Sequence, residues 1–368
     1  MSTEHGLSTI AGAQAYLAST RFASTSITLL SGAHSNFTYR LHLAAPYKGH
    51  PTLVMKHAKS YIILSASEKL YAMERQTFEA KALQKIKEDL DTGLATVPQL
   101  HHFDADAHFI IIEDCGEQSR NLKELFLKSP PPPAVAREIG LVLGEFLGRL
   151  HSWSVVDPTI PDAFAGNTQA KKITAWITYE RLLPALTTNP FPEIALLPSP
   201  ILESELDAIC AIVSTRVSEI HAARTALTMG DFWTGNIVVN LPDGGAAPPR
   251  VHVVDWELVK PGVPALDLGQ FCAEMQTLTL FKPETAASAG ALIDAFLTEY
   301  RAHCGAMAPR TANVAAEHMG AHLVTITPWV AWGPPEEAVK AVELGLTYLR
   351  EGCDDRWVRE SSVFGPLM

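Results

Sequence analysis

The sequence lacks several features that define whole classes of protein. No run of about 18 apolar residues occurs, so we expect no membrane-spanning helix. The N-terminal segment has neither a basic region nor a long apolar region, so we expect no signal peptide. The five cysteines are scattered and show neither C-x-x-C spacing nor a disulfide framework. Together these absences predict a soluble, reduced, cytoplasmic protein.

Basic residues are also in short supply, with 29 lysines and arginines against 40 aspartates and glutamates and a net charge of −11. The acidic residues are spread along the chain and do not form a tail. This balance argues against nucleic acid or an anionic membrane surface as a partner, and it is compatible with a cationic small molecule. With 368 residues, of which 47% are apolar, the chain is long enough for two domains or lobes.

The first part of the chain is predicted to be a small lobe made mostly of strands. Residues 8–20 are expected to form a short amphipathic helix. Alternating apolar residues then predict three strands, at 27–30, 38–43 and 52–56.

The turn at 31–36, SGAHSN, lies between the first two of these strands. Such a turn can lay backbone N–H groups over the phosphates of a nucleotide, which would bring in Gly32 and Asn36. Only one glycine is present where a phosphate-binding loop prefers several, so an ordinary hairpin turn is an equal alternative.

Lys56 closes the third predicted strand. A lysine in this place is usually a solvated edge residue. The alternative is a lysine that reaches the phosphates of a nucleotide, which needs a carboxylate to position it. The predicted helix 73–90 offers Glu74 and Glu79, and we favour Glu79 because its neighbour Phe78 belongs to the buried stripe of that helix.

Two further strands are predicted at 100–103 and 109–113, the second within the apolar run FIIIEDCG. Polar residues end this run at Glu113, Asp114 and Cys115, as is typical of a strand that leaves its sheet as a hinge. Backbone C=O and N–H groups around these residues are expected to pair with adenine.

Three segments follow from this pattern. Residues 1–114 are predicted to form a nucleotide-binding lobe, and 115–133 a hinge and linker with a short helix at 122–127 and four consecutive prolines. Residues 134–368 are predicted to form a larger helical lobe. Its expected helices lie at 134–151, 203–224, 286–304, 312–326 and 335–351.

One hairpin interrupts the helical lobe and carries the strongest signal. Asp231 and Asn236 lie on a loop that leads into an apolar strand at 237–239, and Asp255 follows a second strand at 251–254. Pairing of these strands brings the three polar residues to one end. In phosphoryl transfer an Asn and an Asp hold Mg²⁺ while another Asp orients the attacking hydroxyl. A single aspartate here is more often a turn or cap residue, but the combination favours a kinase-like site.

The chain resembles the aminoglycoside phosphotransferase/choline kinase family over nearly its whole length. The resemblance is carried by LLSGAHSNFTYR, LVMKH, ERQTFEAKAL, FIIIEDCG, LGRLHSW, GDFWTGNIVV, VVDWE and ALDLGQF, of which the last are highly specific and the first is weak. Within the family it is closest to the branch of the methylthioribose kinases and the fungal 4-hydroxytryptamine kinases. The implied fold is α+β and bilobal, with a small antiparallel β N-lobe and a large, mainly helical C-lobe.

The resemblance also implies roles for individual residues. Asp231 would be the catalytic base or would orient the acceptor hydroxyl. Asn236 and Asp255 would hold Mg²⁺, and Lys56 paired with Glu79 would hold the phosphates of ATP.

Four further residues need separate comment. Glu257 would add a second carboxylate to the metal site, although a polar residue leaving the strand is an equal alternative. Asp267 is expected to cap a helix and to brace the catalytic loop. Met229 stands where the family commonly has His, and Ala33 replaces a usual Gly in the phosphate turn. A thioether can fill the place of that His in a core, so we expect activity to be retained.

Two other classes of protein agree less well with the sequence. A protein kinase would need a G-x-G-x-x-G loop and an A-P-E sequence, and neither is present. A non-enzymatic pseudokinase would be expected to have lost one of the four residues Lys56, Asp231, Asn236 and Asp255, and all four are retained.

The acceptor is expected to be a small molecule with a hydroxyl group, bound by a monomer. Trp233, Glu274, Trp329 and Trp332 are candidates for holding it by stacking, cation–π contact or charge, although tryptophans in apolar helical segments are more often core residues. A hydroxylated amine such as 4-hydroxytryptamine is our first hypothesis. Methylthioribose, choline, ethanolamine and aminoglycosides are the alternatives.

Overall fold

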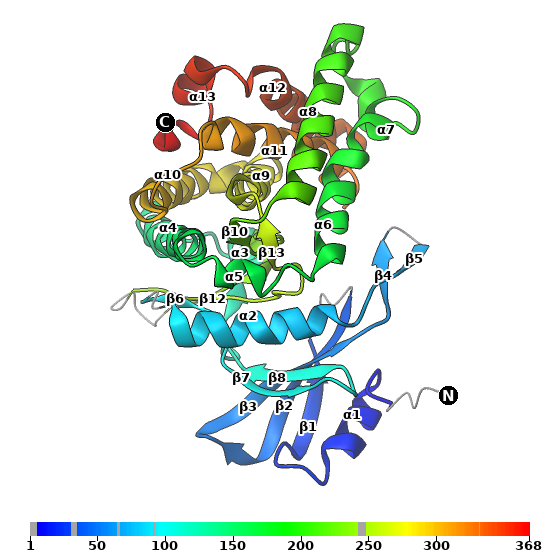
Figure 1. Cartoon of the computed structure of the whole chain (residues 1–368), viewed down its shortest axis with the longest axis vertical. Helices are drawn as coiled ribbons and strands as arrows, with labels where there is room; N and C mark the ends of the chain where they lie inside the picture. Colours follow the sequence, from blue (N-terminus) through cyan, green and yellow to red (C-terminus); the bar gives the residue numbers. More distant parts are fainter. Residues whose placement is uncertain (1–5, 31–34, 65–66, 91–92, 242–247, 331) are drawn as a thin grey trace. The chain divides into compact units, whose positions relative to one another are not determined.

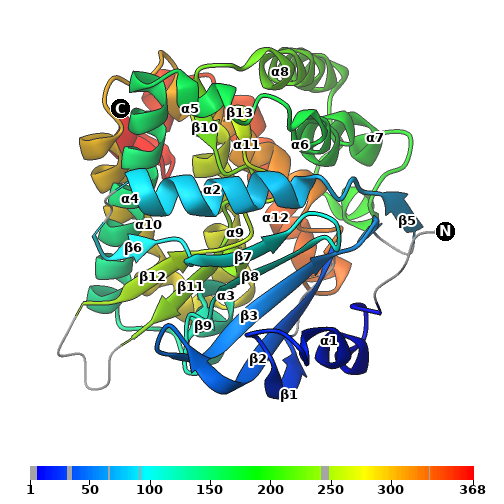
Figure 2. The same cartoon turned by 60° about the horizontal axis from the view of Figure 1, so that its bottom comes forward.

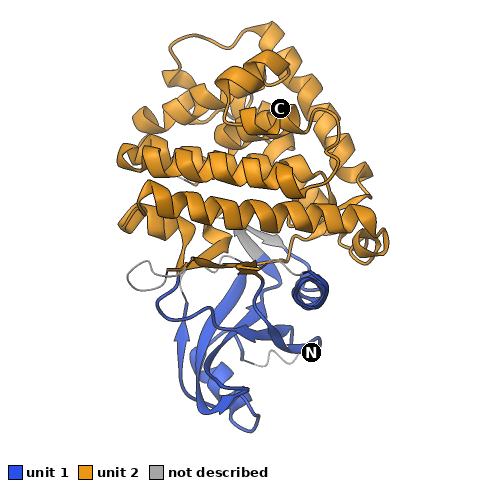
Figure 3. Ribbon diagram, turned by 90° about the vertical axis from the view of Figure 1, so that its left-hand side faces the viewer, with its two compact units in different colours: residues 1–91, 97–119 blue, residues 92–96, 120–368 orange. Residues whose placement is uncertain are grey.

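The computed structural model describes residues 6–30, 35–64, 67–90, 93–241, 248–330 and 332–368. The chain divides into two compact units, one formed by residues 1–91 and 97–119 and the other by 92–96 and 120–368 (Figure 3). The last boundary between the units, after residue 119, falls inside the segment 115–133 for which the sequence predicts a hinge and linker. Each unit is described by itself below.

The first unit contains a five-stranded antiparallel sheet with the strand order β1-β2-β3-β8-β7 (Figures 1 and 2). Its strands are β1 (Ser24–Leu29), β2 (Asn36–Tyr47), β3 (His50–Ala58), β7 (Leu100–Asp104) and β8 (Phe109–Glu113). The unit also holds α1 (Ile10–Leu17), the hairpin β4 (Tyr61–Leu64) and β5 (Ser67–Leu70), and α2 (Arg75–Asp89). All five predicted strands are confirmed, while the hairpin β4–β5 was not predicted.

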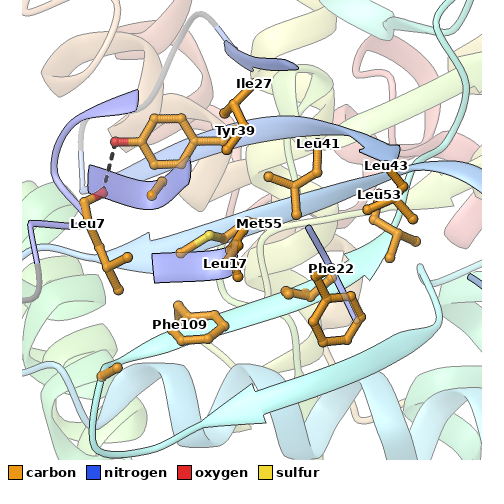
Figure 4. Packing of buried hydrophobic residues seen from close by; sticks show 13 residues of the cluster. Leu7, Leu17, Phe22, Ile27, Tyr39, Leu41, Leu43, Leu53, Met55 and Phe109 are labelled. Atoms are coloured by element: carbon orange, nitrogen blue, oxygen red, sulfur yellow. Dashed lines mark hydrogen bonds between the residues drawn. The ribbon is translucent and has the colours of Figure 1, made fainter. Parts of the chain in front are cut away.

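Alternation along the strands gives this sheet two different faces. On one face Tyr39, Leu41, Leu53 and Met55 are buried in a core that α1 covers with Leu17 (Figure 4). The hydroxyl of Tyr39 donates a hydrogen bond to the backbone carbonyl of Leu7 at 2.9 Å, which satisfies the one polar atom of the buried ring. Successive side chains of a strand point to opposite faces, so Lys56 lies on the other face from Met55.

The second unit is mainly helical. Its helices are α3 (Leu122–Lys128), α4 (Pro133–Val156), α5 (Thr159–Asp162), α6 (Thr168–Thr174), α7 (Leu182–Leu186), α8 (Glu203–Ala222), α9 (Pro264–Phe281), α10 (Ala286–His303), α11 (Thr311–Thr325), α12 (Pro335–Glu351) and α13 (Asp355–Ser361). Shorter turns of helix are the π-helix η1 (Ala175–Glu180) and the 3₁₀ turns η2 (Pro192–Leu196), η3 (Thr234–Asn236), η5 (Pro283–Thr285) and η6 (Gly365–Leu367). The predicted helices correspond to α3, α4, α8, α10, α11 and α12.

Two small sheets lie within the helical unit. One has the order β6-β12-β11-β9 and the other pairs β10 with β13. Their strands are β6 (Ala95–Thr96), β9 (Arg120–Asn121), β10 (Ala226–Thr228), β11 (Ile237–Asn240), β12 (Arg250–Val253) and β13 (Lys260–Gly262). The predicted hairpin is confirmed as the antiparallel pair β11 and β12, with Ile237 opposite Val253.

Glycines let two long helices of this unit approach each other closely. A Cβ atom at Gly140, Gly144 or Gly148 of α4 would lie 2.3 to 2.8 Å from a backbone oxygen of α10. Four-residue spacing keeps the three glycines on one face of α4. The helices therefore pack backbone against backbone, and this rigid pair supports the elements that carry the site. Within the described residues, no helix combines the length and the apolar character that a membrane crossing requires.

Candidate active site

The hairpin β11–β12 carries three of the predicted residues to one end of the helical unit. Asn236 immediately precedes β11, and Asp255 comes two residues after the end of β12. The backbone N–H of Val254 donates to the carbonyl of Asn236 at 2.9 Å, which closes this end of the ladder. Asp231 lies on the loop between β10 and η3, five positions before Asn236, and Asp255 follows the partner strand of the hairpin.

Two amides hold the carboxylate of Asp231. The side-chain N–H of Gln270, from α9, donates to Oδ1 at 2.9 Å, and that of Asn236 donates to Oδ2 at 2.9 Å. Loss of water around the carboxylate and the negative charge of Asp255 raise the pKa of Asp231 to about 7, while the two amide hydrogen bonds act in the opposite direction. A carboxylate that is fixed in place and titrates near neutrality is suited to accept a proton.

Asp255 has a backbone conformation that few residues other than glycine adopt, with φ of +68°. The fully buried Trp256 anchors this turn, because its ring N–H donates to the carbonyl of Val253 at 2.9 Å. The strained turn directs the chain so that a carboxylate oxygen of Asp255 comes within 4.8 Å of one of the buried Glu257. Two carboxylates at this separation, near the Asn236 amide, are hard oxygen donors that suit a divalent cation such as Mg²⁺.

Asp267 supports the loop that carries Asp231, but it does not cap a helix. The N-cap of α9 is Val263, and Asp267 lies inside the first turns, so the predicted helix-cap role is wrong. Its buried carboxylate instead accepts the backbone N–H groups of Met229 at 2.9 Å and Gly230 at 3.0 Å. The backbone at Gly230, with φ of +81°, leaves no room for a side chain, since a Cβ there would meet the ammonium of Lys260.

His151 of α4 contacts Asp267 and so supports the same loop. Its Nε2 lies 3.3 Å from Oδ2 of Asp267, and its Nδ1 lies 3.0 Å from the hydroxyl of Tyr300. A carboxylate only accepts, so Nε2 carries the hydrogen in this contact. Met229 is completely buried, and its thioether contributes to the core while its backbone N–H contributes to the loop. The imidazole that touches Asp267 thus comes from a residue far away in the sequence.

Lys56 and Glu79 form a close ion pair in the first unit. The ammonium of Lys56 lies 2.8 Å from both carboxylate oxygens of Glu79, and Gln76 donates to the Lys56 carbonyl at 2.7 Å. Glu74, the competing candidate, is exposed at the start of α2. Phe78 is only half-buried, whereas Glu79 is buried, so the prediction that Phe78 lies on the buried stripe is wrong.

The predicted phosphate turn is described only in part. Gly32 and Ala33 lie outside the described residues. Asn36 is buried at the start of β2, where its amide donates to the hydroxyl of Ser35 at 2.9 Å. The guanidinium of Arg75, from α2, donates to the carbonyl of Ser35 at 2.7 Å and thereby ties α2 to the end of this turn. No local sequence pattern marks Arg75 as part of the site, because the contact joins residues forty positions apart.

The side chains of the predicted hinge make structural contacts of their own. The carboxylate of Glu113 accepts the backbone N–H of Gln99 at 3.0 Å, and Asp114 forms an ion pair with Arg40 at 2.7 Å. Cys115 follows them with a free thiol. Any pairing with a nucleotide base would therefore use backbone groups, as the sequence predicts.

Three of the four predicted acceptor residues lie in one cluster. Trp233 and Trp332 both face the ammonium of Lys123, whose charge also interacts with that of Glu274. Trp329 instead lies against Arg181, with the guanidinium carbon 4.1 Å from its ring centroid. The sequence did not predict Lys123, because nothing in its local pattern distinguishes it from a solvated helix residue.

These arrangements define an enzyme of the phosphotransferase class. Residues 26–306 match the family described as the phosphotransferase enzyme family, and the chain belongs to it. It is similar to the 4-hydroxytryptamine kinases of Psilocybe cubensis, at 27% identity over 86% of this chain and 84% of the relative, and of Psilocybe cyanescens, at 28% over 90% and 89%. Its fold is similar to that of aminoglycoside 2'-phosphotransferase-IIIa in a GDP complex, with a TM-score of 0.50, 12% identity and coverage of 89% of this chain and 92% of that one.

The predicted fold class and enzyme class are therefore confirmed. The chain has a mixed α+β fold and is a small-molecule kinase of the phosphotransferase enzyme family.

Proposed function

We propose that this chain transfers the γ-phosphoryl group of ATP, bound with Mg²⁺, to the hydroxyl of 4-hydroxytryptamine or a related hydroxylated amine. The observation that carries the proposal is the fixed carboxylate of Asp231, held by Gln270 and Asn236 beside the carboxylates of Asp255 and Glu257. Such a group of residues matches the needs of phosphoryl transfer, in which the protein positions the reactants and neutralises charge.

In this proposal Asp231 accepts the proton of the acceptor hydroxyl as its oxygen bonds to the γ-phosphorus and the bond from that phosphorus to ADP breaks. Asn236, Asp255 and Glu257 hold Mg²⁺, which when bound neutralises charge on the phosphates. Asp267 and the backbone of Met229 keep the loop in place. The proposal therefore gives proton acceptance and metal binding to adjacent but separate carboxylates.

The nucleotide-binding roles belong to the first unit. Lys56, oriented by Glu79, binds the phosphates of ATP. Asn36, at the start of β2, contributes to binding these phosphates, and the backbone of residues 113–115 pairs with the base. The 2.8 Å ion pair supports the first of these roles, because the lysine is already held in one orientation.

Two observations support an amine acceptor. The relatives quoted above are 4-hydroxytryptamine kinases, and the acceptor candidates Trp233, Trp332 and Glu274 combine aromatic faces with a negative charge. Aromatic rings and a carboxylate recognise a protonated amine by cation–π contact and charge. Trp329, which packs on Arg181, is given no role in acceptor binding.

The proposal is tested by ADP release from ATP and Mg²⁺ with a panel of hydroxylated amines, methylthioribose, choline, ethanolamine and aminoglycosides. We expect turnover of the hydroxylated amines. Asp231→Ala should lower kcat by about 100-fold or more, the usual contribution of a positioned general base, and leave ATP binding intact. Asp207→Ala, an exposed aspartate on α8, is the control. Turnover of methylthioribose and of no amine would disprove the substrate assignment, and an unchanged rate in Asp231→Ala would disprove the base.

A further inference from the structure

The helix α9 carries a line of side chains that begins at the proposed base. Gln270 holds Asp231, and Glu274 lies four residues further on, which puts it on the same face of the helix. Phe281, another seven residues along, continues this face and stacks on Trp332 with ring centroids 5.7 Å apart. Gln270, which holds the proposed base, the carboxylate of Glu274 and the ring of Phe281 are thus arranged in order along one face of α9.

Glu274 is a buried carboxylate with one oxygen in use. Its side chain is part of a residue only 4% exposed, and Oε1 lies 3.0 Å from Nε2 of His322. Oε2 is buried and has no hydrogen-bond partner within the part of the chain that the structure describes. A buried acceptor without a donor is unfavourable, so this oxygen is a site for a donor from outside the chain.

A cation interacts electrostatically with this carboxylate. The ammonium of Lys123, from α3, is 3.8 Å from the ring centroid of Trp332 and 5.4 Å from that of Trp233. The indole N–H of Trp332 is a second buried polar atom for which the described residues offer no partner. Burial lowers the pKa of Lys123, and the charge of Glu274 acts in the opposite direction. The surroundings therefore offer aromatic faces and a negative charge to an ammonium group, but burial leaves the charged lysine incompletely satisfied in them.

We propose that Lys123 occupies, in the acceptor-free chain, the position of the acceptor's own ammonium group, and that a cationic acceptor displaces it to bind Trp332 and the free oxygen of Glu274. This inference rests on the proposed function and specifies how the acceptor is chosen. Glu274 becomes the residue that selects an amine, with His322 as its positioning partner. Lys123 becomes an internal competitor that keeps neutral molecules from the same place.

The spacing along α9 limits the size of the acceptor. Four residues of helix rise by about 6 Å, so the selected ammonium and the phosphorylated hydroxyl are separated by roughly that distance. Aromatic faces on Trp233 and Trp332 favour a flat ring between the two groups. An arylalkylamine with a ring hydroxyl and a short amine-bearing chain fits these three conditions.

The first test compares 4-hydroxytryptamine with its N-acetyl derivative, which keeps the ring and hydroxyl but has no positive charge. Glu274→Gln preserves the shape of the side chain and an oxygen for His322. We expect this variant to raise KM for the amine about 30-fold or more, the usual effect of removing one partner of a buried charge pair, and to leave KM for the N-acetyl compound unchanged. An equal loss for both compounds would overturn the role of Glu274. Glu284→Gln, at an exposed site, is the matched control.

The second test addresses the competition. Lys123→Met removes the internal cation and retains the apolar stem, so KM for the amine should fall about 5-fold or more, a change in line with one exposed cation–π contact. Lys128→Met on the same helix, where the lysine is exposed, should leave KM unchanged. A rise in KM in Lys123→Met would mean that the lysine binds the acceptor itself, which would overturn the proposal.

A binding measurement separates this inference from the proposed function. Tryptamine has no hydroxyl and cannot be phosphorylated, so calorimetric titration with it reports only on the cation position. Tryptamine should bind wild type and bind Lys123→Met more tightly, while Glu274→Gln should bind it about 30-fold or more weakly. This pattern without turnover of any hydroxyl compound would retain the cation site and disprove the proposed function. Turnover of the amine together with equal tryptamine binding by all three proteins would disprove the cation site and retain the proposed function.

Discussion

The carboxylate of Asp231 shows how single residues set the working range of the site. Its pKa lies near 7 because the loss of water and the charge of Asp255 outweigh the hydrogen bonds from Gln270 and Asn236. In the proposed function the ionised form is the proton acceptor, so kcat/KM should fall tenfold per pH unit below this pKa. A plot of kcat/KM against pH, which reports the free enzyme, provides the measurement. A profile that is flat from pH 5 to 8 would contradict the assignment.

Gln270 offers a variant that moves this profile in a known direction. Its N–H stabilises the ionised form of Asp231, so Gln270→Met should raise the pKa and shift the acidic limb of the profile to higher pH. A general loss of activity without a shift would indicate that Gln270 only positions Asp231. Gln276→Met, further along the same helix, serves as the control.

At this scale the sequence predicts residues that share a local motif and misses those that meet through the fold. Asp231, Asn236 and Asp255 could be recognised because one hairpin contains them. Gln270 and His151 could not, because each becomes meaningful only when α9 or α4 packs against the loop. Asp267 is a further example. Its residue type suggested a helix cap, whereas in the fold its carboxylate accepts hydrogen bonds from the backbone of the loop that carries Asp231.

Among the elements, most helices that the sequence predicts have one apolar face, as α4 and α12 do, although α11 is predicted and is buried along its whole length. The sequence does not predict α9 as a helix of this extent, because nearly every residue from Ala265 to Leu278 is buried and the pattern has no polar side. The short helices α5 to α7 lack enough turns for a period to appear, and β6 pairs with a strand more than 150 residues away.

The glycines of α4 make an element-scale prediction with an internal control. A Cβ at Gly144 would lie 2.3 Å from the carbonyl oxygen of Phe296, so Gly144→Ala must separate α4 from α10. We expect it to lower the free energy of unfolding by about 1–3 kcal/mol, as in other overpacked cores. Gly290→Ala on α10 has nothing within 4 Å and should raise stability by about 1 kcal/mol through helix propensity. Urea unfolding of both variants measures the two effects, and a stabilising Gly144→Ala would disprove close packing.

On the scale of the whole molecule, the sequence predicts the order of a strand-rich segment followed by a helical one, because that order follows from the periodicity of long stretches. Which residues belong to each unit cannot be predicted in the same way. Residues 92–96 belong to the helical unit although they lie inside the strand-rich segment, since β6 pairs with β12. No local sequence pattern predicts such a pairing, because residues 95–96 form a strand only through their hydrogen bonds with β12.

The free energy of unfolding should depend on pH because Lys260, next to the loop that carries Asp231, is a buried cation. Burial lowers the pKa of Lys260 to about 8, against 10.5 for the free side chain, with Asp267 and Asp231 acting in the opposite direction. Between pH 8 and 10.5 the unfolded chain therefore binds more protons at this residue than the folded chain does. Stability contributed by this residue must then rise with pH across this window, by about 1.4 kcal/mol for each unit of pKa difference that is traversed.

Comparing Lys260→Met with wild type at pH 7.5 and 9.5 isolates this contribution. Wild type should gain of the order of 1–2 kcal/mol relative to the variant over this interval, measured as the urea midpoint and slope of the transition that unfolds the helical unit. Lys282→Met, at an exposed site, should follow wild type at both pH values. Buried Tyr348, whose pKa burial raises to about 12, has the opposite effect only above about pH 10, where the unfolded tyrosine ionises first, so it does not enter this window. An unchanged difference between Lys260→Met and wild type would mean that the ammonium is not held away from water.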